Sequence, residues 1–212
     1  MKIIAHRGYW NEQIECNSPQ ALYAALTHGY GVESDLRDYQ GRLVISHNIA
    51  EETSQDAEEV FRWLGENQDR FCFAINIKAD GLKELIQKQL AENHIKNYFL
   101  FDMSVPQMVE FQQMGLTYFT RQSEVEPDPV MYETAAGIWI DGFWENDWIR
   151  EGLLQGHISK GKSVCLVSPE LHGKEPMPFW NRLRAFEIPW DRVFLCTDIP
   201  DAAAEFFERQ LD

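Results

Sequence analysis

The sequence is short of cysteine and of long apolar runs, and each shortage excludes a class of protein. Its four cysteines form no Cys-x-x-Cys pair, and Cys72, Cys165 and Cys196 lie inside short apolar runs. We therefore expect buried free thiols in a reducing cytoplasm, and neither a disulfide framework nor a structural zinc site. No apolar run approaches the roughly 18 residues that span a bilayer. The N-terminal residues also show no apolar signal-peptide segment.

Basic residues are scarce as well. Acidic residues outnumber basic ones by 34 to 19, which gives a formal net charge of -15. A general binder of nucleic-acid phosphates or of an anionic membrane would have to overcome this repulsion, so we expect neither partner. The net negative charge does not exclude a small anionic substrate, because a local site can be positive within an acidic surface. The aromatic content of 13% argues against a disordered chain.

Short apolar runs alternate with segments of helical period along the chain. The runs predict strands at 3–5, 31–36, 72–77, 98–101, 116–119, 137–140, 163–167 and 193–196, with an extra strand at 43–45 after a turn at 38–41. Helices are expected from Asn17 or Ser18, over 82–90, from Ser104, from Asp128-Pro129, and over 145–158, 178–186 and 200–211.

Eight predicted strands that alternate with helical segments predict an α/β fold. We expect a (β/α)8 TIM barrel formed by one domain over residues 1–212. A doubly wound open sheet is the alternative. The chain has no Gly-x-Gly-x-x-Gly after its first strand and no Gly-x-x-x-x-Gly-Lys-Ser/Thr, which are the usual nucleotide-binding marks of that alternative.

Polar or charged side chains end each predicted strand. In a (β/α)8 barrel these strand ends form the active site. The candidates, in chain order, are His6 and Arg7, Glu33 and Asp35, Asn76 and Lys78, Asp102, Arg121, Asp141, Glu170 and His172, and Asp198.

The pair Glu33 and Asp35 is the most informative of these. Residues two apart in a strand point to the same face, and two carboxylates held together repel each other unless a cation lies between them. Ligation by oxygen alone suits Mg²⁺ or Ca²⁺. Asn76 and Lys78 repeat the spacing and offer an amide oxygen to the metal and an ammonium group to an anion. The competing interpretation is a solvated strand face.

Two histidines, His6 and His47, each follow a short apolar run. Either one alone is typical of a structural histidine, but two near a metal are suited to general acid and base chemistry near neutral pH. His28, His94 and His157 fall on predicted helices and are expected at the surface. Arg7, Lys78 and Arg121 could hold a phosphate. The residues alone thus predict metal-assisted chemistry on a phosphorylated substrate.

The ordered motifs resemble the glycerophosphodiester phosphodiesterase family. They are Ile4-Ala5-His6-Arg7-Gly8, Gly31-Val32-Glu33-Ser34-Asp35-Leu36-Arg37, Gly41-Arg42-Leu43-Val44-Ile45-Ser46-His47, Ile75-Asn76-Ile77-Lys78 and Thr197-Asp198-Ile199-Pro200. The resemblance implies a barrel of the phospholipase C-like phosphodiesterase type, a divalent metal (Mg²⁺ or Ca²⁺) and a place in lipid metabolism. The implied reaction is hydrolysis of a phosphodiester with release of an alcohol.

The resemblance also implies roles for individual residues. His6 and His47 would be the acid–base pair, and Glu33, Asp35 and position 76 would be the metal ligands. Substrate and phosphate contacts would come from Arg7, Lys78, Arg121, Glu170 and His172. In the related mechanism a neighbouring substrate hydroxyl attacks first, and water then opens the cyclic phosphate.

Three departures from the family pattern indicate a divergent variant. The chain has Glu15-Cys16-Asn17 for Pro-Glu-Asn, His47-Asn48 for His-Asp, and Asn76 for a glutamate ligand. Losing that carboxylate should weaken metal binding. A weakly catalytic barrel that binds a phosphorylated ligand, or a lyase that stops at the cyclic phosphate, therefore remain alternatives. Trp139, Trp144, Trp148 and Trp180 could form an aromatic platform for a sugar or polyol group.

Overall fold

The computed structural model describes residues 1–67 and 69–208, which divide into two compact units. One unit is continuous and spans Ala5–Tyr118; we call it the N-terminal unit. The other contains Met1–Ile4 and the residues from Phe119 onward; we call it the C-terminal unit.

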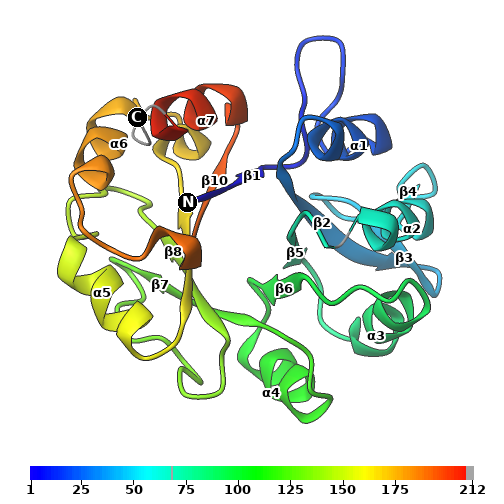
Figure 1. Cartoon of the computed structure of the whole chain (residues 1–212). Helices are drawn as coiled ribbons and strands as arrows, with labels where there is room; N and C mark the ends of the chain where they lie inside the picture. Colours follow the sequence, from blue (N-terminus) through cyan, green and yellow to red (C-terminus); the bar gives the residue numbers. More distant parts are fainter. Residues whose placement is uncertain (68, 209–212) are drawn as a thin grey trace. The chain divides into compact units, whose positions relative to one another are not determined.

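The N-terminal unit has a sheet in the order β4-β3-β2-β5-β6. Its strands are β2 (Gly31–Tyr39), β3 (Arg42–Ile45), β4 (Gln55–Asp56), β5 (Phe73–Ile77) and β6 (Tyr98–Phe101), and its helices are α1 (Pro19–Thr27), α2 (Glu58–Asn67), α3 (Lys83–Glu92) and α4 (Val105–Gln113). β2, β5 and β6 are parallel, whereas β3 and β4 form an antiparallel extension. The predicted extra strand at 43–45 is therefore confirmed, and Figure 1 shows it beside β2.

The C-terminal unit repeats the same alternation in the order β1-β10-β9-β8-β7. Its strands are β1 (Lys2–Ala5, whose first residues belong here), β7 (Phe119–Ser123), β8 (Gly137–Asp141), β9 (Ser163–Val167) and β10 (Val193–Thr197). Its helices are α5 (Glu151–Ser159), α6 (Met177–Arg184) and α7 (Pro200–Glu208), with short 3-10 helices η1 (Pro169–His172) and η2 (Trp190–Arg192).

Strand order within each unit discriminates between the two predicted architectures. β7, β8, β9 and β10 are parallel and lie beside one another in sequence order, and β2, β5 and β6 do the same. A doubly wound sheet reverses its strand order at a switch point, and neither run of parallel strands contains a reversal. The α/β class is confirmed, and the strand order within each unit is that of a TIM-barrel-like fold.

Local sequence explains why the helices start where they do. The side chains of Ser18 and Ser104 each accept a hydrogen bond of 3.2 Å from the backbone N–H of the third residue of the helix that follows. A proline stands in the first turn of each of these helices. Just before α1, Gly8 has a φ of +88°, and a Cβ there would lie 2.5 Å from the carbonyl carbon of Ala21. Only glycine permits this close approach, which fixes the chain directly after His6 and Arg7.

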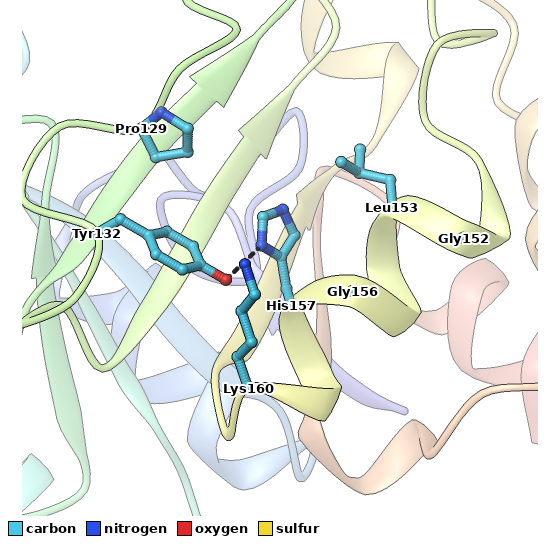
Figure 2. Close-up of a pocket in the computed structure, with 7 residues that line it drawn as sticks. All are labelled: Pro129, Tyr132, Gly152, Leu153, Gly156, His157 and Lys160. Atoms are coloured by element: carbon cyan, nitrogen blue, oxygen red, sulfur yellow. Dashed lines mark hydrogen bonds between the residues drawn. The ribbon is translucent and has the colours of Figure 1, made fainter.

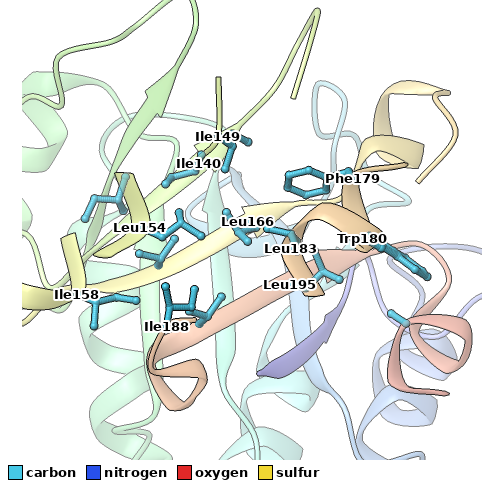
Figure 3. Packing of buried hydrophobic residues seen from close by; sticks show 14 residues of the cluster. Ile140, Ile149, Leu154, Ile158, Leu166, Phe179, Trp180, Leu183, Ile188 and Leu195 are labelled. Atoms are coloured by element: carbon cyan, nitrogen blue, oxygen red, sulfur yellow. The ribbon is translucent and has the colours of Figure 1, made fainter. Parts of the chain in front are cut away.

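A core of branched aliphatic and aromatic side chains fills the C-terminal unit between its sheet and helices (Figure 3). Leu166, Leu183 and Leu195 are completely buried. Trp180 is also buried, and its indole N–H donates to Ser168 Oγ at 2.9 Å, so this polar group is satisfied inside the core. Cys72, Cys165 and Cys196 are buried, as predicted, and form no disulfide within the described residues.

Some predicted elements are wrong or displaced. α2 was not predicted, because its four apolar residues are matched by four charged ones and the segment has no capping serine or first-turn proline like those that begin α1 and α4. The helix predicted from Asp128-Pro129 is absent, and residues 130–134 form turns. β7 begins at Phe119, where the predicted strand ended. The last predicted helix is α7, and its expected end at Leu211 lies outside the described residues. None of the described helices has the length and apolar character needed to cross a membrane.

Candidate active site

Three predicted metal ligands share one face of the sheet in the N-terminal unit. β2 and β5 pair in parallel with Asp35 directly opposite Asn76, and Glu33 precedes Asp35 by two residues on the same face. All three are buried within the strands, with exposed fractions of 1% for Glu33, 1% for Asp35 and 7% for Asn76. These three polar side chains lie among mainly apolar strand residues, so they need hydrogen-bonding or ionic partners.

Asp35 is the electrostatic centre of this face. Its Oδ2 lies 3.1 Å from Arg7 Nε and accepts a 2.7 Å hydrogen bond from Asn17 Nδ2, while its Oδ1 lies 3.3 Å from Lys78 Nζ. Burial alone would raise the pKa of Asp35. The Lys78 ammonium, the hydrogen bond from Asn17 and the Arg7 guanidinium outweigh burial and hold its pKa below the usual value. Asp35 is thus ionised at neutral pH.

Glu33 has the opposite electrostatic balance. Its Oε2 accepts a 3.0 Å hydrogen bond from the backbone N–H of Arg7 and lies 3.9 Å from His6 Nε2. Burial, followed by the negative charge of Asp35, raises the pKa of Glu33 to about 7. A second negative charge beside Asp35 is therefore unfavourable unless more positive charge reaches the pair.

Three oxygen atoms on this face are well placed to receive that positive charge. Among the described residues, Glu33 Oε1, Asp35 Oδ1 and Asn76 Oδ1 are each buried and accept no hydrogen bond, although Lys78 Nζ lies 3.3 Å from Asp35 Oδ1. Buried acceptors without donors are rare in proteins and indicate a water or an ion. Two carboxylates and an amide oxygen form a donor set that suits Mg²⁺ or Ca²⁺, so these residues fit a hard cation. Within the described residues, no group of three or more His, Cys, Asp or Glu side chains is placed to hold a metal, and the third oxygen of this set comes from the amide of Asn76.

His47 meets Arg7 and Asp35 at a single ring nitrogen. Its Nδ1 lies 2.8 Å from Arg7 Nη2 and 3.3 Å from Asp35 Oδ2. Nδ1 can donate to Asp35 when it carries a proton or accept from Arg7 when it does not, and one tautomer cannot do both. The ring is 45% exposed. His47 can therefore reach a ligand, and its Nδ1 faces both a donor, Arg7 Nη2, and an acceptor, Asp35 Oδ2.

Lys78 and Arg7 bring positive charge to the same face. Lys78 lies 3.3 Å from Asp35 and its Nζ is 3.9 Å from Asp102 Oδ2, and its side chain is 19% exposed. The Arg7 side chain is 25% exposed. Both cations contact the buried carboxylate of Asp35 and are partly exposed to solvent, which suits them to hold an anionic group.

Asn17 is a site residue that sequence reasoning treated only as a helix cap. Its side chain donates to Asp35 and accepts a 3.0 Å hydrogen bond from Ser34 Oγ, while Ser18 is the actual cap. Asn17 has a φ of +61°, a conformation that asparagine tolerates better than most residues. The sequence signal for this site role was the position of Asn17 directly before Ser18 and Pro19, where α1 begins.

The other predicted substrate residues lie in the C-terminal unit and have protein partners. Arg121, on β7, is held by both carboxylate oxygens of Glu126. Glu170 accepts hydrogen bonds from Ser168, Thr197 and the backbone of Asp198, so both of its carboxylate oxygens are engaged.

His172 is placed differently. Its Nε2 lies 2.7 Å from Asp141 Oδ1, and its ring packs edge-on against Phe143. The side chain is 27% exposed, which leaves it accessible to a ligand.

Two further expectations are revised by burial. His157 is only 7% exposed, so its predicted surface position is wrong, whereas His28 and His94 are exposed as expected. Of the four tryptophans considered for an aromatic platform, Trp139 and Trp180 are buried and Trp144 is 69% exposed.

Comparison with solved structures places this geometry in a known fold. A protein provisionally assigned as a glycerophosphodiester phosphodiesterase from Galdieria sulphuraria superposes with a TM-score of 0.76 at 14% identity, covering 98% of this chain and 97% of its own. A glycerophosphodiester phosphodiesterase from Parabacteroides distasonis gives 0.70 at 15% identity, covering 100% and 98%. One from Agrobacterium tumefaciens gives 0.69 at 15% identity, covering 96% and 99%.

Sequence comparison, by contrast, finds no match. No family model matches the chain, and no curated protein matches it. Since the structural matches are full-length but only 14–15% identical, they establish the fold: the chain has the α/β, TIM-barrel-like fold of the glycerophosphodiester phosphodiesterase structures.

Proposed function

We propose that this chain is a metal-dependent phosphoric diester hydrolase of the glycerophosphodiester phosphodiesterase family. The observation that carries the proposal is the set of three buried oxygens, on Glu33, Asp35 and Asn76, that accept no hydrogen bond within the part of the chain that the structure describes. They are flanked by two imidazoles and two cations in the same unit. The fold shared with phosphodiesterase structures supports the same reaction class.

In this proposal the chain closes as one (β/α)8 domain and uses Mg²⁺ or Ca²⁺. When bound, the ion would neutralise charge that develops on the phosphate oxygens. Glu33, Asp35 and Asn76 would hold it, and their low charge, two carboxylates instead of three, would make binding weaker than in a three-carboxylate site. Free buried cysteines support a reducing, cytoplasmic location.

Phosphate binding falls to Arg7 and Lys78. Each contacts Asp35 on its buried side and is partly open to solvent. A phosphodiester carries one negative charge, and both cations would stabilise the added charge in the transition state more than the ground state, which is the condition for catalysis.

Proton transfer falls to His6 and His47. One imidazole removes the proton of a neighbouring substrate hydroxyl as its oxygen attacks phosphorus, and the other donates a proton to the departing alcohol oxygen. The bond to the alcohol breaks, and the cyclic phosphate is then opened by water with the proton roles reversed. Nδ1 of His47 lies beside Arg7, which donates to it when it carries no proton, and beside Asp35, which accepts from it when it does.

We propose a glycerophosphodiester or a sugar- or polyol-linked phosphodiester as the substrate class. Arg121, Glu170 and His172 remain proposed substrate contacts. His172 is the best placed of these, since it is accessible and held by Asp141. Glu170 would act indirectly through the strand-end residues that it binds.

The test is turnover of a panel of phosphodiesters followed by ³¹P NMR. We expect a phosphomonoester as the final product, and replacing His172 by Ala should raise KM more than it lowers kcat. Accumulation of a cyclic phosphate would identify a lyase.

A second candidate function is a barrel that binds a phosphorylated ligand without turnover. Asn76 in place of a carboxylate favours it, because metal affinity falls with ligand charge. Tight binding of a diester with no product after prolonged incubation in Mg²⁺ or Ca²⁺ would support this candidate and contradict hydrolysis.

A further inference from the structure

A groove of about 310 Å³ lies beside α5 in the C-terminal unit, and none of the residues discussed above as catalytic lines it. Gly152, Leu153 and Gly156 of α5 form one side, and Pro129 and Tyr132 form the other (Figure 2). Its volume is at the lower end of the range for small-molecule sites, and its walls are mainly apolar with a few polar groups, as in such sites.

The floor of the groove is flat because two glycines one helical turn apart face it. A Cβ built on Gly152 or Gly156 would meet nothing within 4 Å, so the space above both positions is open. Glycine is a poor helix former, yet α5 carries two of them on its groove face. A bare backbone surface of this kind accommodates a planar ring better than a branched aliphatic group.

A chain of buried hydrogen bonds fixes the polar groups at one end of the groove. Gln122 Nε2 donates to the Pro127 carbonyl, so its Oε1 accepts from His157 Nε2 at 2.8 Å. His157 Nδ1 then accepts from the Tyr132 hydroxyl at 2.9 Å. Burial, with the charge of Lys160 adding to it, lowers the pKa of His157 to about 4, which keeps this ring neutral. Tyr132 is therefore locked in place.

The charged group at this end is Lys160. Its Nζ lies 5.2 Å from the centroid of the Tyr132 ring, and its charge acts on buried His157. Lys162 Nζ lies 5.1 Å from the same ring and donates to the carbonyls of Glu133 and Ala135. Lys160 and Lys162 thus place two ammonium groups beside the Tyr132 ring, and Glu133 is the carboxylate whose charge acts on the Tyr132 hydroxyl.

We propose that this groove binds a small planar aromatic carboxylate. The ring lies over the Gly152–Gly156 face of α5, between Leu153 and Tyr132, and the carboxylate pairs with the Lys160 ammonium group. This site is separate from the proposed phosphodiester chemistry and does not depend on it.

The experiment uses benzoate as the probe on the full chain, with calorimetry for affinity and methyl NMR for location. We expect a dissociation constant of about 2 mM or lower, a range typical of a ligand of this size, and shifted Leu153 methyl signals. Gly156→Leu, which fills the open floor, should abolish binding while the thermal melt shows a folded protein.

Charge recognition is tested by Lys160→Met and by benzyl alcohol, which keeps the ring and lacks the charge. Each should weaken binding at least about tenfold, equivalent to about 1.4 kcal/mol, whereas the matched control Lys88→Met on α3 should bind benzoate normally. Absence of binding at about 20 mM benzoate, tenfold above the expected constant, would overturn the proposal. Equal affinity of benzoate for wild type and Lys160→Met, or undiminished binding to folded Gly156→Leu, would also overturn it.

Discussion

Replacing Glu33 by glutamine should stabilise the metal-free protein and at the same time abolish its activity. Glu33 is 1% exposed, and burial together with the charge of Asp35 raises its pKa from 4.5 to about 7. A structural carboxylate would show the opposite pattern, because its loss would destabilise the fold. The direction of the stability change is therefore diagnostic of a carboxylate kept for a cation.

The magnitude follows from the pKa shift. In the unfolded chain the carboxyl group loses its proton near pH 4.5, and in the folded protein near pH 7. The folded state binds more protons between these values, so the stability of the metal-free protein falls as the pH rises from 4.5 to about 7. At about 1.4 kcal/mol per pKa unit, the ionised side chain costs on the order of 3 kcal/mol above that range. Glutamine carries no charge and avoids this cost.

The assay is urea unfolding in EDTA at about pH 8, where the folded wild-type carboxyl group has ionised. Glu33→Gln should be about 2–3 kcal/mol more stable than wild type there and similar to it at about pH 4. The control Glu59→Gln, on the exposed face of α2, should change stability by less than about 0.5 kcal/mol. A variant less stable than wild type at the higher pH would refute the reasoning, as would undiminished diester turnover in the presence of metal.

Three other predictions concern neighbouring residues. Asn76→Glu adds the missing carboxylate and should tighten Mg²⁺ or Ca²⁺ binding in calorimetry; unchanged or weaker affinity would mean that Asn76 is not a ligand. His6→Ala and His47→Ala should each slow turnover about 100- to 10,000-fold. A p-nitrophenolate leaving group, which needs no proton, should rescue the variant that lacks the acid, and equal rescue of both would contradict distinct roles. Asn17→Ala removes a hydrogen bond to buried Asp35 and should cost about 1.5–3 kcal/mol of stability; a loss under about 0.5 kcal/mol would show that this contact contributes little.

The sequence was informative wherever local chemistry decides the outcome. Serine caps and prolines determine the starts of α1 and α4, and period-two polarity on β2 places Glu33 and Asp35 on one face. The extra strand β3 follows from a turn at Gln40 and Gly41, both of which have positive φ. These features depend on neighbours within a few residues, so the sequence displays them directly.

Features set by distant contacts could not be predicted in the same way. α2 buries Phe61 against Phe73 of β5, a contact that its own sequence does not reveal. His157 lies on a helix, yet Gln122 and Tyr132 from other segments enclose it. Glu170 accepts hydrogen bonds from Thr197 and Asp198 at the end of another strand, and the sequence does not show this pairing. In each case the partner lies 12 or more residues away in the chain.

The most direct test of the central claim is the hydrolysis of a glycerophosphodiester by the purified chain as a function of free metal. The account predicts turnover that saturates with Mg²⁺ or Ca²⁺, disappears in EDTA and returns when metal is restored. It also predicts that Glu33→Gln lowers this turnover at least about a hundredfold. Hydrolysis at the full rate in EDTA would contradict the claim, and so would a complete absence of hydrolysis by metal-loaded protein across the diester panel.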